Sequence, residues 1–514
     1  GNEGKGRSTV DDREREKGIT MKRRTFLKTA GAAAATAALG GLEGAGAAIK
    51  QPNVLMIAVD DLNDWIGCFG GHPQVKTPNM DRLSKRSTVF HNAHCPAPIC
   101  NPARPAMLTG LRPSTTGHYF LSPNFEEVEA YKGATTLPQY FAENGYHTLG
   151  TGKIFHGGSP HKPYFDEFGP QGSAGPRPEE KISYPMGHPL WDWGAYPERD
   201  DQMPDYQCNE WALKQLERDF DKPWFLALGY SRPHVPLYVP QKWFDMYPLK
   251  DIILPDVLAK DREDVPKYGR DLTYGVTPPP HSWIVDHGEW KHAVQAYLAC
   301  ITFVDHLLGK VLDAVEARGD ADNTVIVFFS DHGFHMGEKQ YWAKRSLWDR
   351  STKVPMMISA PGLDKHQRCD KPTNLMDIYN TLVDLCDLPE NSRLEGQSLV
   401  PLLEKPKRDW ERPSLTTFGQ NNHGLRSERY RYIRYNDGSE EFYDHKHDPN
   451  EWHNLAGQPK YDDLMAEHRK WLPKVNTPEC PKTEGSGWEA SEYAQGRLDL
   501  LAKDVEGRIV GEGS

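Results

Sequence analysis

Apolar segments of strand length recur along this chain, and segments with helical periodicity alternate with them. The strand-like segments are residues 53–59, 147–151, 224–230, 324–329 and 354–359. The helical segments are residues 77–89, 136–144, 210–220, 292–318 and 375–385. Strands that are apolar almost throughout must be covered on both faces. The alternation therefore predicts an α/β fold, with a large, mostly parallel sheet sandwiched by helices.

The sequence pattern changes after residue 409. Residues 424–435 alternate between polar and apolar, and Asn-Asp-Gly at 436–438 provides a turn before 442–444, which predicts an antiparallel hairpin. We expect three parts: an N-terminal extension (1–47), a catalytic domain (48–408) and a smaller C-terminal subdomain with an antiparallel sheet (409–514). Two irregular segments rich in Pro and Gly, 157–203 and 236–289, interrupt the catalytic domain, and we expect the first to form a wall of its site.

The N-terminal extension has the pattern of an export signal. Residues 22–28 contain paired arginines followed by Phe-Leu-Lys, a run of small residues covers 29–39, and Ala-Gly-Ala at 45–47 offers a cleavage site. The alternative is an alanine-rich surface helix. The pattern resembles a bacterial twin-arginine signal, so we expect an exported protein, periplasmic or secreted, with Met21 as a candidate start.

Charge and composition argue against several classes of protein. The 61 basic and 72 acidic residues give a net charge of −11, so no nucleic-acid partner is expected. No apolar run reaches the length of a membrane span, and none is expected in the mature protein. The 8 cysteines show no dense disulfide framework. Cys300 and Cys386 fall on apolar helix faces and are expected to be buried thiols.

Polar side chains follow four of the predicted strands. They are Asp60 and Asp61, Lys153 and His156, His234, and Asp331 and His332. Ligand sites in open α/β sheets lie at the carboxyl ends of the strands, so these side chains are expected to meet. Three converging carboxylates would repel one another without a cation, which favours a site for a hard divalent metal ion.

Cys100 opens the segment Cys-Asn-Pro-Ala-Arg, which continues as Pro-Ala-Met-Leu-Thr-Gly. Pro102 suits the first turn of a helix and Gly110 suits its end. Free backbone N–H groups at such a helix mouth, with Arg104 beside them, form an anion site. A buried structural cysteine is the alternative reading of a lone thiol.

This segment resembles the signature of the type I sulfatases, C-x-P-[S/A]-R followed after four residues by Thr-Gly. In that family the cysteine is oxidised to Cα-formylglycine by a formylglycine-generating enzyme. The resemblance implies an alkaline-phosphatase-like fold, and residues 442–456 resemble the closing motif of sulfatases. Residues 152–156, 229–236, 331–333 and 342–344 also match the iduronate-2-sulfatase branch in order.

The resemblance implies a calcium ion, Ca²⁺, held by Asp60, Asp61, Asp331 and His332, with the modified Cys100 as a further ligand. His332 stands where the family has Asn or His. Because nitrogen is a softer ligand than calcium prefers, the sequence predicts the metal site more firmly than the identity of the metal. Lys153 and Lys344 are implied to hold sulfate oxygens. For Lys344 the alternative interpretation is a charged side chain that is exposed to solvent and has no role in binding.

The implied reaction begins with the hydrated aldehyde at position 100. One of its geminal hydroxyls attacks sulfur, while the cation, Arg104 and the two lysines stabilise the sulfate oxygens. His156 is implied to bond a hydroxyl of the hydrate, and His234 is the candidate acid for the leaving oxygen. The second hydroxyl then expels sulfate and restores the aldehyde, and either His156 or an aspartate is the base for that step.

The expected activity is hydrolysis of sulfate esters on a sulfated oligo- or polysaccharide, with a 2-O-sulfated uronate as the leading substrate. The alternatives are a phosphonate or phosphate ester hydrolase of the same superfamily, or an inactive sulfatase-like protein that binds sugar. The sequence departs from the iduronate-2-sulfatase pattern in the irregular segments, where residues 159–166 show no match, and at Phe334 and His335, which follow the Asp-His-Gly motif. The identity of the sugar, endo or exo action, the disulfide pairing and the oligomeric state stay open.

Overall fold

The computed structural model describes residues 51–157, 161–185, 188–273, 278–363 and 365–481. The predicted N-terminal extension therefore lies outside the described residues, as does the end of the predicted C-terminal subdomain from residue 482.

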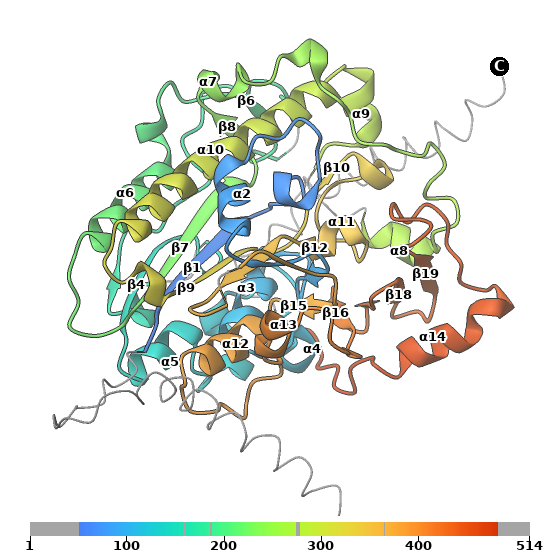
Figure 1. Ribbon diagram of the computed structural model, residues 1–514. Helices are drawn as coiled ribbons and strands as arrows, with labels where there is room; N and C mark the ends of the chain where they lie inside the picture. The colour runs from blue at the N-terminus through green and yellow to red at the C-terminus, as the bar shows by residue number, and fades with distance from the viewer. Residues whose placement is uncertain (1–50, 158–160, 186–187, 274–277, 364, 482–514) are drawn as a thin grey trace, which may run out of the picture. The chain divides into compact units, whose positions relative to one another are not determined.

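The main sheet has eight strands in the order β14-β2-β13-β9-β1-β7-β4-β5. Figure 1 shows its central strands β4, β7, β1 and β9 side by side. Its central strands are β4 (His147–Gly152), β7 (Trp224–Pro233), β1 (Asn53–Asp60), β9 (Thr324–Ser330) and β13 (Met356–Ser359). The strands β2 (Thr88–Phe90), β14 (Gln367–Cys369) and β5 (Glu167–Phe168) complete it. All neighbours pair in parallel except β13, which runs antiparallel to β2 and β9. The predicted mostly parallel sheet is confirmed.

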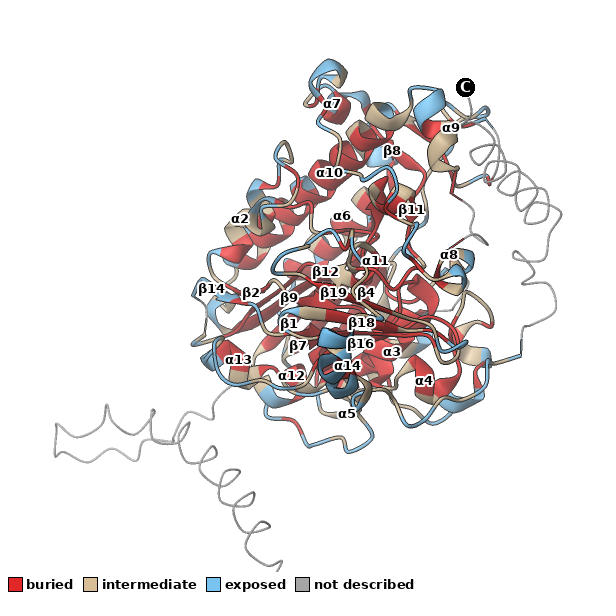
Figure 2. Cartoon of the chain, turned by 90° about the vertical axis from the view of Figure 1, so that its right-hand side faces the viewer, coloured by how far each residue is buried: buried red, intermediate tan, exposed pale blue. Residues whose placement is uncertain are grey.

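Alternate side chains of β1 enter two different hydrophobic cores. Leu55, Ile57 and Val59 pack with the helices α2 (Pro78–Ser84), α6 (Pro204–Leu216) and α10 (Trp290–Glu316). Val54, Met56 and Ala58 pack with α3 (Cys100–Thr109), α5 (Leu137–Glu143), α12 (Asp377–Leu385) and α13 (Val400–Glu404). Because both faces of the strand are covered, it is apolar throughout, and its burial is visible in Figure 2.

The predicted helix over residues 77–89 is wrong in its second half. The helix α2 ends at Ser84, and the chain enters the strand β2 four residues later. The β-branched residues Thr88 and Val89 pair there with β13 and β14. Their preference for the extended chain outweighs the apolar pattern that favoured a longer helix. The helices α5, α10 and α12 lie within two residues of their predicted ranges, whereas α6 begins six residues before the predicted 210–220 and ends four residues before its predicted end.

Both irregular segments contain short elements. The first holds β5 and β6 (Trp193–Ala195), and the second holds β8 (Leu237–Val239), α7 (Gln241–Phe244), α8 (Lys267–Leu272) and α9 (His281–Asp286). The strands β6 and β8 pair with each other in parallel, which joins the two segments. Further short elements are β3 (Ala93–His94), α4 (Pro113–Thr116), β10 (His335–Met336), β11 (Trp342–Ala343), α11 (Asp349–Thr352), β12 (Lys353–Val354) and β15 (Thr373–Asn374).

A separate antiparallel sheet follows the main sheet in sequence. Its strands are β16 (Ser414–Thr417), β17 (His423–Arg426), β18 (Tyr430–Arg434) and β19 (Glu440–Asp444), in that order. The predicted hairpin is confirmed as β18 and β19, but residues 424–435, predicted as one alternating segment, are divided between the two paired strands β17 and β18. The helix α14 (Asp462–Arg469) packs Met465 against this sheet. The domain boundary near residue 409 stays a prediction.

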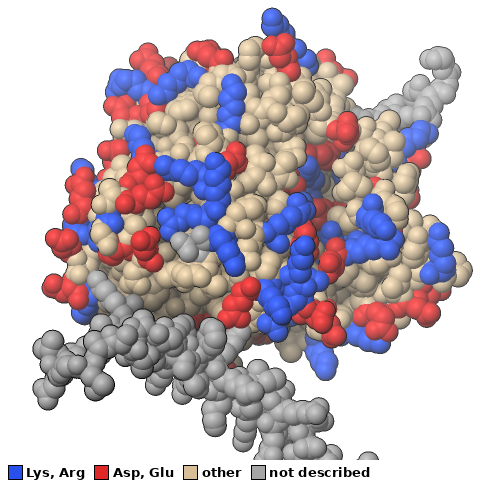
Figure 3. All heavy atoms as spheres, in the orientation of Figure 1, with Lys and Arg blue, Asp and Glu red and all other residues tan. Residues whose placement is uncertain are grey.

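None of the eight cysteines forms a disulfide within the described residues, which include all of them. Cys300 and Cys386 are fully buried, as expected from their helix faces. Lys and Arg are interspersed with Asp and Glu over the face shown in Figure 3.

Candidate active site

The register of the central strands brings the predicted polar side chains to one edge of the sheet. β1 lies between β7 and β9, with Asp60 opposite Pro233 and Val59 opposite Ser330. The residues that follow these strand ends therefore lie side by side. On the far side of β7, Gly152 of β4 pairs with Gly229, and the chain continues into Lys153.

The pairing of Gly152 with Gly229 depends on the absence of side chains. Gly152 has a φ of 75°, and a Cβ there would lie 1.9 Å from the carbonyl oxygen of Gly229. A Cβ on Gly229 would in turn lie 2.1 Å from the carbonyl oxygen of Lys153. The two glycines thus let β4 end close against β7, which brings Lys153 to the site.

Cys100 lies at the start of α3, as its sequence pattern predicted. All ten residues of this helix are buried. Gly110 ends the helix in the left-handed conformation, with a φ of 71°. Arg104, in the second turn, donates from Nη1 to the carbonyl oxygens of Lys153 and Ile154, the second at 3.2 Å. The helix is therefore tied directly to the end of β4.

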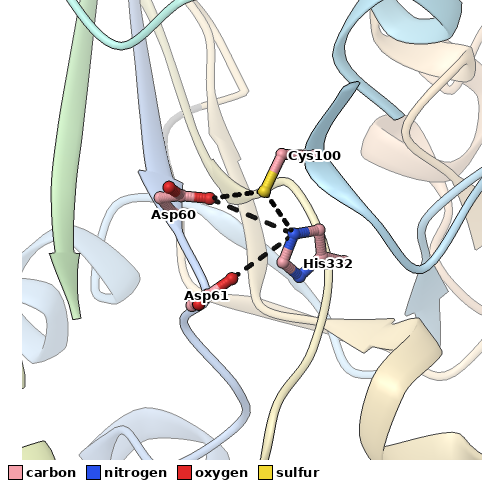
Figure 4. Close-up of side chains that lie close together, drawn as sticks. All are labelled: Asp60, Asp61, Cys100 and His332. Carbon is pink, nitrogen blue, oxygen red and sulfur yellow. Dashed lines mark hydrogen bonds and ion pairs between the residues drawn. The ribbon is translucent and has the colours of Figure 1, made fainter. Parts of the chain in front are cut away.

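Four side chains converge in a candidate metal centre: Asp60, Asp61, Cys100 and His332 (Figure 4). One ligand atom from each lies within 4.8 Å of all the others. The Cys100 Sγ is 3.2 Å from His332 Nε2 and 3.4 Å from Asp60 Oδ1. All four residues are buried, so this cluster of acidic and nitrogen groups lies away from solvent.

The chemistry of this cluster fits a divalent cation. Asp61 Oδ2 is buried and accepts no hydrogen bond from the described part of the chain. Burial opposes ionisation of Asp60, yet the charges of Lys153, His234 and Arg104 hold the pKa of its carboxyl below the usual value. Ionised carboxylate oxygens are the ligands that hard cations prefer. The backbone of Asp61 is held in the left-handed region, with a φ of 62°.

Asp331 lies beside this cluster and is bonded to Arg104. Its Oδ2 accepts a hydrogen bond from Arg104 Nε at 2.8 Å, and its Oδ1 accepts from the Asp61 backbone N–H at 3.3 Å. Oδ1 also lies 3.5 Å from His332 Nε2. Burial raises the pKa of Asp331 to about 7, although Arg104 opposes this shift. Its role as a metal ligand stays a prediction.

Two lysines bring positive charge to Cys100. Lys344 Nζ lies 3.3 Å from the Sγ and 2.5 Å from Asp61 Oδ1. Lys153 forms an ion pair with Asp60. Although burial opposes it, the charges of Lys153, Lys344 and His332 lower the pKa of Cys100 well below its usual range. The position therefore favours negative charge on whatever group it holds.

Two histidines also approach the centre. His156 hydrogen-bonds Cys100, and its Nδ1 is buried with no hydrogen-bond partner among the described residues. His234 Nε2 lies 3.9 Å from Asp61 Oδ2, and its Nδ1 lies 2.6 Å from the carbonyl oxygen of Val235. The structure thus brings together every predicted site residue, although their roles stay predictions.

The antiparallel sheet holds the loop that carries Lys344. Arg431 of β18 donates from Nη1 to the carbonyl oxygen of Leu347 at 3.1 Å, and its Nη2 lies 2.5 Å from Asp349 Oδ1. Its Nε is 2.6 Å from Glu451 Oε1. The guanidinium is only 1% exposed, so these are buried ion pairs. Sequence reasoning missed this residue, because the pairing is long-range and the strand is otherwise an ordinary alternating one.

The centre opens into a cavity of about 630 Å³. The first irregular segment contributes much of its lining, including Gln171, Arg177, His188 and Trp191. Phe334 and Arg345 also line it. Sequence reasoning did not single out Arg177, His188, Trp191 or Arg345 as site residues. For Arg345 its place directly after Lys344 was an available signal; the other three gave none.

Residues 52–388 match the sequence model of the sulfatase family, and residues 337–477 match that of the N-sulphoglucosamine sulphohydrolase C-terminal region. A sulfatase of Formosa agariphila is 43% identical, over 83% of this chain and 87% of the relative. Human iduronate 2-sulfatase is 35% identical, over 63% of this chain and 62% of its own length. The resemblance stated from the Cys100 segment and the strand-end motifs is confirmed.

Two solved structures have a similar fold. A 2-O GAG sulfatase superimposes with a TM-score of 0.65 at 24% identity, covering 82% of this chain and 91% of that one. The phosphonate monoester hydrolase of Agrobacterium radiobacter gives 0.66 at 22% identity, covering 82% and 95%. The predicted alkaline-phosphatase-like fold is confirmed. At these identities the likeness concerns the fold alone.

Residues 20–40 match the TAT (twin-arginine translocation) pathway signal sequence. The predicted export by the twin-arginine route is therefore confirmed. Among the helices that the structure describes, none has both the length and the apolar character to cross a membrane.

Proposed function

The chain belongs to the sulfatase family, the sulfuric ester hydrolases, and we propose that it removes sulfate from a sulfated carbohydrate through a formylglycine at position 100 and a divalent cation. One observation carries this proposal: Cys100 has its ligand atom within 4.8 Å of two carboxylates and an imidazole, and it lines a cavity together with Lys153 and Lys344.

The Cys100 Sγ stands in for the oxygens of the modified residue. A hydrated formylglycine supplies one hydroxyl to attack sulfur and a second whose deprotonation releases sulfate and restores the aldehyde. The cation, proposed as Ca²⁺, supplies Lewis acidity toward the bound oxygens. Asp60, Asp61 and His332 are its proposed ligands, with position 100 and Asp331 completing the set.

The chain's own basic residues bind and polarise the sulfate. Lys344, 3.3 Å from the Sγ, is placed to hold a sulfate oxygen next to position 100. Lys153 is placed to hold another from the side of Asp60. The Nη2 of Arg104 is buried without a hydrogen-bond partner among the described residues, and it lies 3.6 Å from Asp60 Oδ1. Fixed cations in a buried site stabilise developing negative charge without reorganisation.

The two histidines handle protons. His156 bonds the group at position 100 and holds a hydroxyl of the hydrate in place. His234 lines the cavity on the side of Asp61 and donates a proton to the leaving sugar oxygen. The base of the second step is His156 or one of the aspartates.

The proposed substrate is a 2-O-sulfated uronate within an oligo- or polysaccharide. Human iduronate 2-sulfatase and the 2-O GAG sulfatase are named for this position of the sulfate. The cavity is large enough for a saccharide unit, and an apolar side chain, Trp191, lines it beside the charged groups.

The test pairs mass spectrometry of the Cys100 peptide with sulfate release from defined sulfated oligosaccharides. We expect an aldehyde in place of the thiol and release from uronate 2-sulfates, and a Cys100→Ala variant serves as the inactive control. Activity on another sulfated sugar alone would overturn the substrate but leave the chemistry. An intact thiol with no sulfate release would instead favour an inactive sugar-binding protein.

The same panel includes aryl phosphate and phosphonate esters. Turnover of these that exceeds turnover of the matched aryl sulfate would favour the phosphonate or phosphate ester hydrolase. We expect the sulfate ester to be preferred, because Lys153, His156, His234 and Lys344, the set that the sulfatase resemblance implies, all line the cavity.

A formylglycine-generating enzyme is the proposed partner in maturation. Since every residue of α3 is buried in the folded chain, that enzyme must act before folding. A chain expressed without it is expected to keep the thiol and to lack sulfatase activity.

A further inference from the structure

Asp61, a proposed ligand of the cation, has a backbone conformation that residues with a side chain rarely adopt. Its φ of 62° lies in the left-handed region. A residue other than glycine stays in that region only where contacts around it enforce the conformation. The position of the carboxylate depends on it, because Asp61 Oδ1 lies 2.5 Å from Lys344 Nζ and 3.4 Å from His332 Nε2 (Figure 4). A rotation of this backbone would move the carboxylate away from the candidate metal centre.

The hydroxyl of Tyr297 bonds the turn that Asp61 begins. It donates a hydrogen bond to the carbonyl oxygen of Asp61 at 2.7 Å and accepts one from the backbone N–H of Asn63 at 2.9 Å. One phenol oxygen thus satisfies two backbone groups of the turn after β1. Tyr297 is fully buried and belongs to α10, a helix with no residue in the described lining of the cavity.

The same turn is tied to the segment after β9, which carries Asp331 and His332. Asn63 Nδ2 donates to the carbonyl oxygen of Phe334 at 3.0 Å. The ring of Phe334 stacks on the ring of Tyr297, with centroids 5.6 Å apart and planes inclined by 14°. Tyr297 therefore contacts both segments that carry the proposed ligands, the first by hydrogen bonds and the second by ring packing.

We propose that Tyr297 is a positioning residue for the cation, whose hydroxyl holds the Asp61 turn in the conformation that binds the metal ion. This inference rests on the proposed function and adds to it a residue from outside the cavity lining. Groups that orient a metal ligand without touching the metal contribute about 10- to 100-fold to metal affinity or activity. Because two hydrogen bonds end on one oxygen, removing that oxygen releases both backbone groups of the turn at once.

The alternative is a core tyrosine whose hydroxyl only satisfies a nearby backbone, and Tyr247 provides the matched control. Tyr247 is also buried, in the same hydrophobic core as Tyr297. Its hydroxyl accepts a hydrogen bond from the backbone N–H of Lys76 at 2.9 Å and bonds Thr302 of α10. Tyr247 is absent from the described lining of the cavity. Replacing either tyrosine by phenylalanine removes one buried hydroxyl, but only Tyr297 bonds the Asp61 turn.

The test measures the Kd for Ca²⁺ of the wild type, Tyr297→Phe and Tyr247→Phe by competition with a fluorescent chelator. Thermal melts in metal-free buffer compare the stability of the three proteins. We expect Tyr297→Phe to raise the Kd about tenfold and Tyr247→Phe to leave it within about twofold. Both substitutions should lower the Tm by similar amounts, since each leaves a buried backbone N–H without its partner.

Sulfate release from an aryl sulfate by the modified enzyme gives a second comparison. In Tyr297→Phe the Ca²⁺ concentration for half-maximal activity should rise by the same factor as the Kd, and saturating Ca²⁺ should restore kcat. KM at saturating Ca²⁺ should stay unchanged, because the phenylalanine ring still packs on Phe334 of the cavity lining. A loss that only reflected a weakened fold would not be rescued by the metal.

Hydrogen exchange of the wild type gives a reading that needs no variant. If the held turn favours Ca²⁺ binding, then bound Ca²⁺ must favour the held turn, because coupling between the two is reciprocal. The Asn63 amide, which bonds the Tyr297 hydroxyl, should therefore exchange more slowly in Ca²⁺ than in chelator. The Lys76 amide, which bonds the Tyr247 hydroxyl, should exchange at the same rate in both.

Equal effects of the two substitutions on the Kd would overturn the positioning role, as would an Asn63 amide whose exchange does not respond to Ca²⁺. A wild-type protein that does not bind Ca²⁺ would contradict both this role and the proposed cation. A wild-type protein that binds Ca²⁺ but releases no sulfate from any ester would contradict the proposed function, while the Kd comparison would still decide the role of Tyr297.

Discussion

Arg104 and Asp331 form a buried ion pair, with Nε 2.8 Å from Oδ2, that joins the helix of Cys100 to the end of β9. The same guanidinium donates to the chain that carries Lys153. One side chain therefore fixes three segments that come from distant parts of the sequence. The relative positions of Cys100, Lys153 and Asp331 depend on it.

Replacing Arg104 should damage both the fold and the activity. In Arg104→Lys the ammonium group cannot donate in several fixed directions as the guanidinium does. The buried Asp331 then loses a partner whose N–H groups can match both oxygens of a carboxylate. We expect the free energy of unfolding to fall by about 3 kcal/mol and kcat/KM for an aryl sulfate to fall at least about 100-fold. Denaturant titration and steady-state kinetics measure the two effects. Arg199→Lys, at an exposed position, is the control, and an active Arg104→Lys enzyme would show that the pair is dispensable.

Removing the proposed cation should abolish activity without unfolding the protein. Asp61→Asn replaces one proposed carboxyl ligand while keeping the shape of the side chain, and a chelator should have the same effect on the wild type. We expect losses of about 100-fold or more, with recovery in the chelated wild type on adding Ca²⁺. Metal content by mass spectrometry provides an independent reading. Asp313→Asn, a surface carboxylate paired with Arg82, is the control; full activity in chelator would rule out the cation.

Arg431 links the antiparallel sheet to the loop of Lys344, so replacing it should lower both the stability of the fold and the activity. Arg431→Gln leaves Asp349 and Glu451 without their buried partner, and we expect a loss of about 3–5 kcal/mol in the free energy of unfolding. A loosened loop misplaces Lys344, which should lower kcat/KM about tenfold. Arg434→Gln, on the same strand but half-buried beside Glu440, is the matched control. Equal effects of the two variants would contradict a specific role for Arg431.

The stability of the fold should decrease in acid partly through His118. Burial lowers the pKa of His118 from 6.5 to about 4, while its ring bonds Asn101 next to Cys100. Between these two values the unfolded chain binds a proton that the folded chain does not. The contribution of neutral His118 to the free energy of unfolding is therefore fully present above pH 6.5 and is lost as the pH falls toward about 4. The total change is on the order of 3 kcal/mol.

Urea titrations across that pH window measure the effect. His118→Gln is expected to flatten the slope of unfolding free energy against pH, because the titrating group is gone. His453→Gln removes an exposed histidine and serves as the control. An unchanged slope in His118→Gln would show that other groups account for the acid lability.

The sequence allowed the central strands and their polar ends to be predicted, because strands covered on both faces are apolar throughout and stop abruptly. Asp60 after β1 and Asp331 after β9 were therefore recognisable, and the parallel register brings them together. The end of α2 was not predictable in this way. Thr88 and Val89 belong to the short strand β2, whose partners β13 and β14 lie far along the chain, so no local pattern reveals it.

The residues that line the cavity were still harder to predict from the sequence. The place of Arg177 depends on how an irregular segment lies against the sheet, and that segment has no periodicity to read. The role of Arg431 depends on buried charges from three separate segments, whereas its own strand alternates like any half-buried strand. Interactions of this kind are set by tertiary packing, so they become visible only in the structure.

The junction between Arg431 and the Lys344 loop can form only late in synthesis, because β18 is made long after Cys100. Cys100 leaves the ribosome long before β9 and β18 are made, and these later strands supply Asp331 and the clamp on the loop. The nascent chain therefore passes through a long interval in which the cysteine is exposed and its pocket does not exist. Truncation anywhere before β18 should lengthen that interval indefinitely and leave the Cys100 segment open to any enzyme that recognises it.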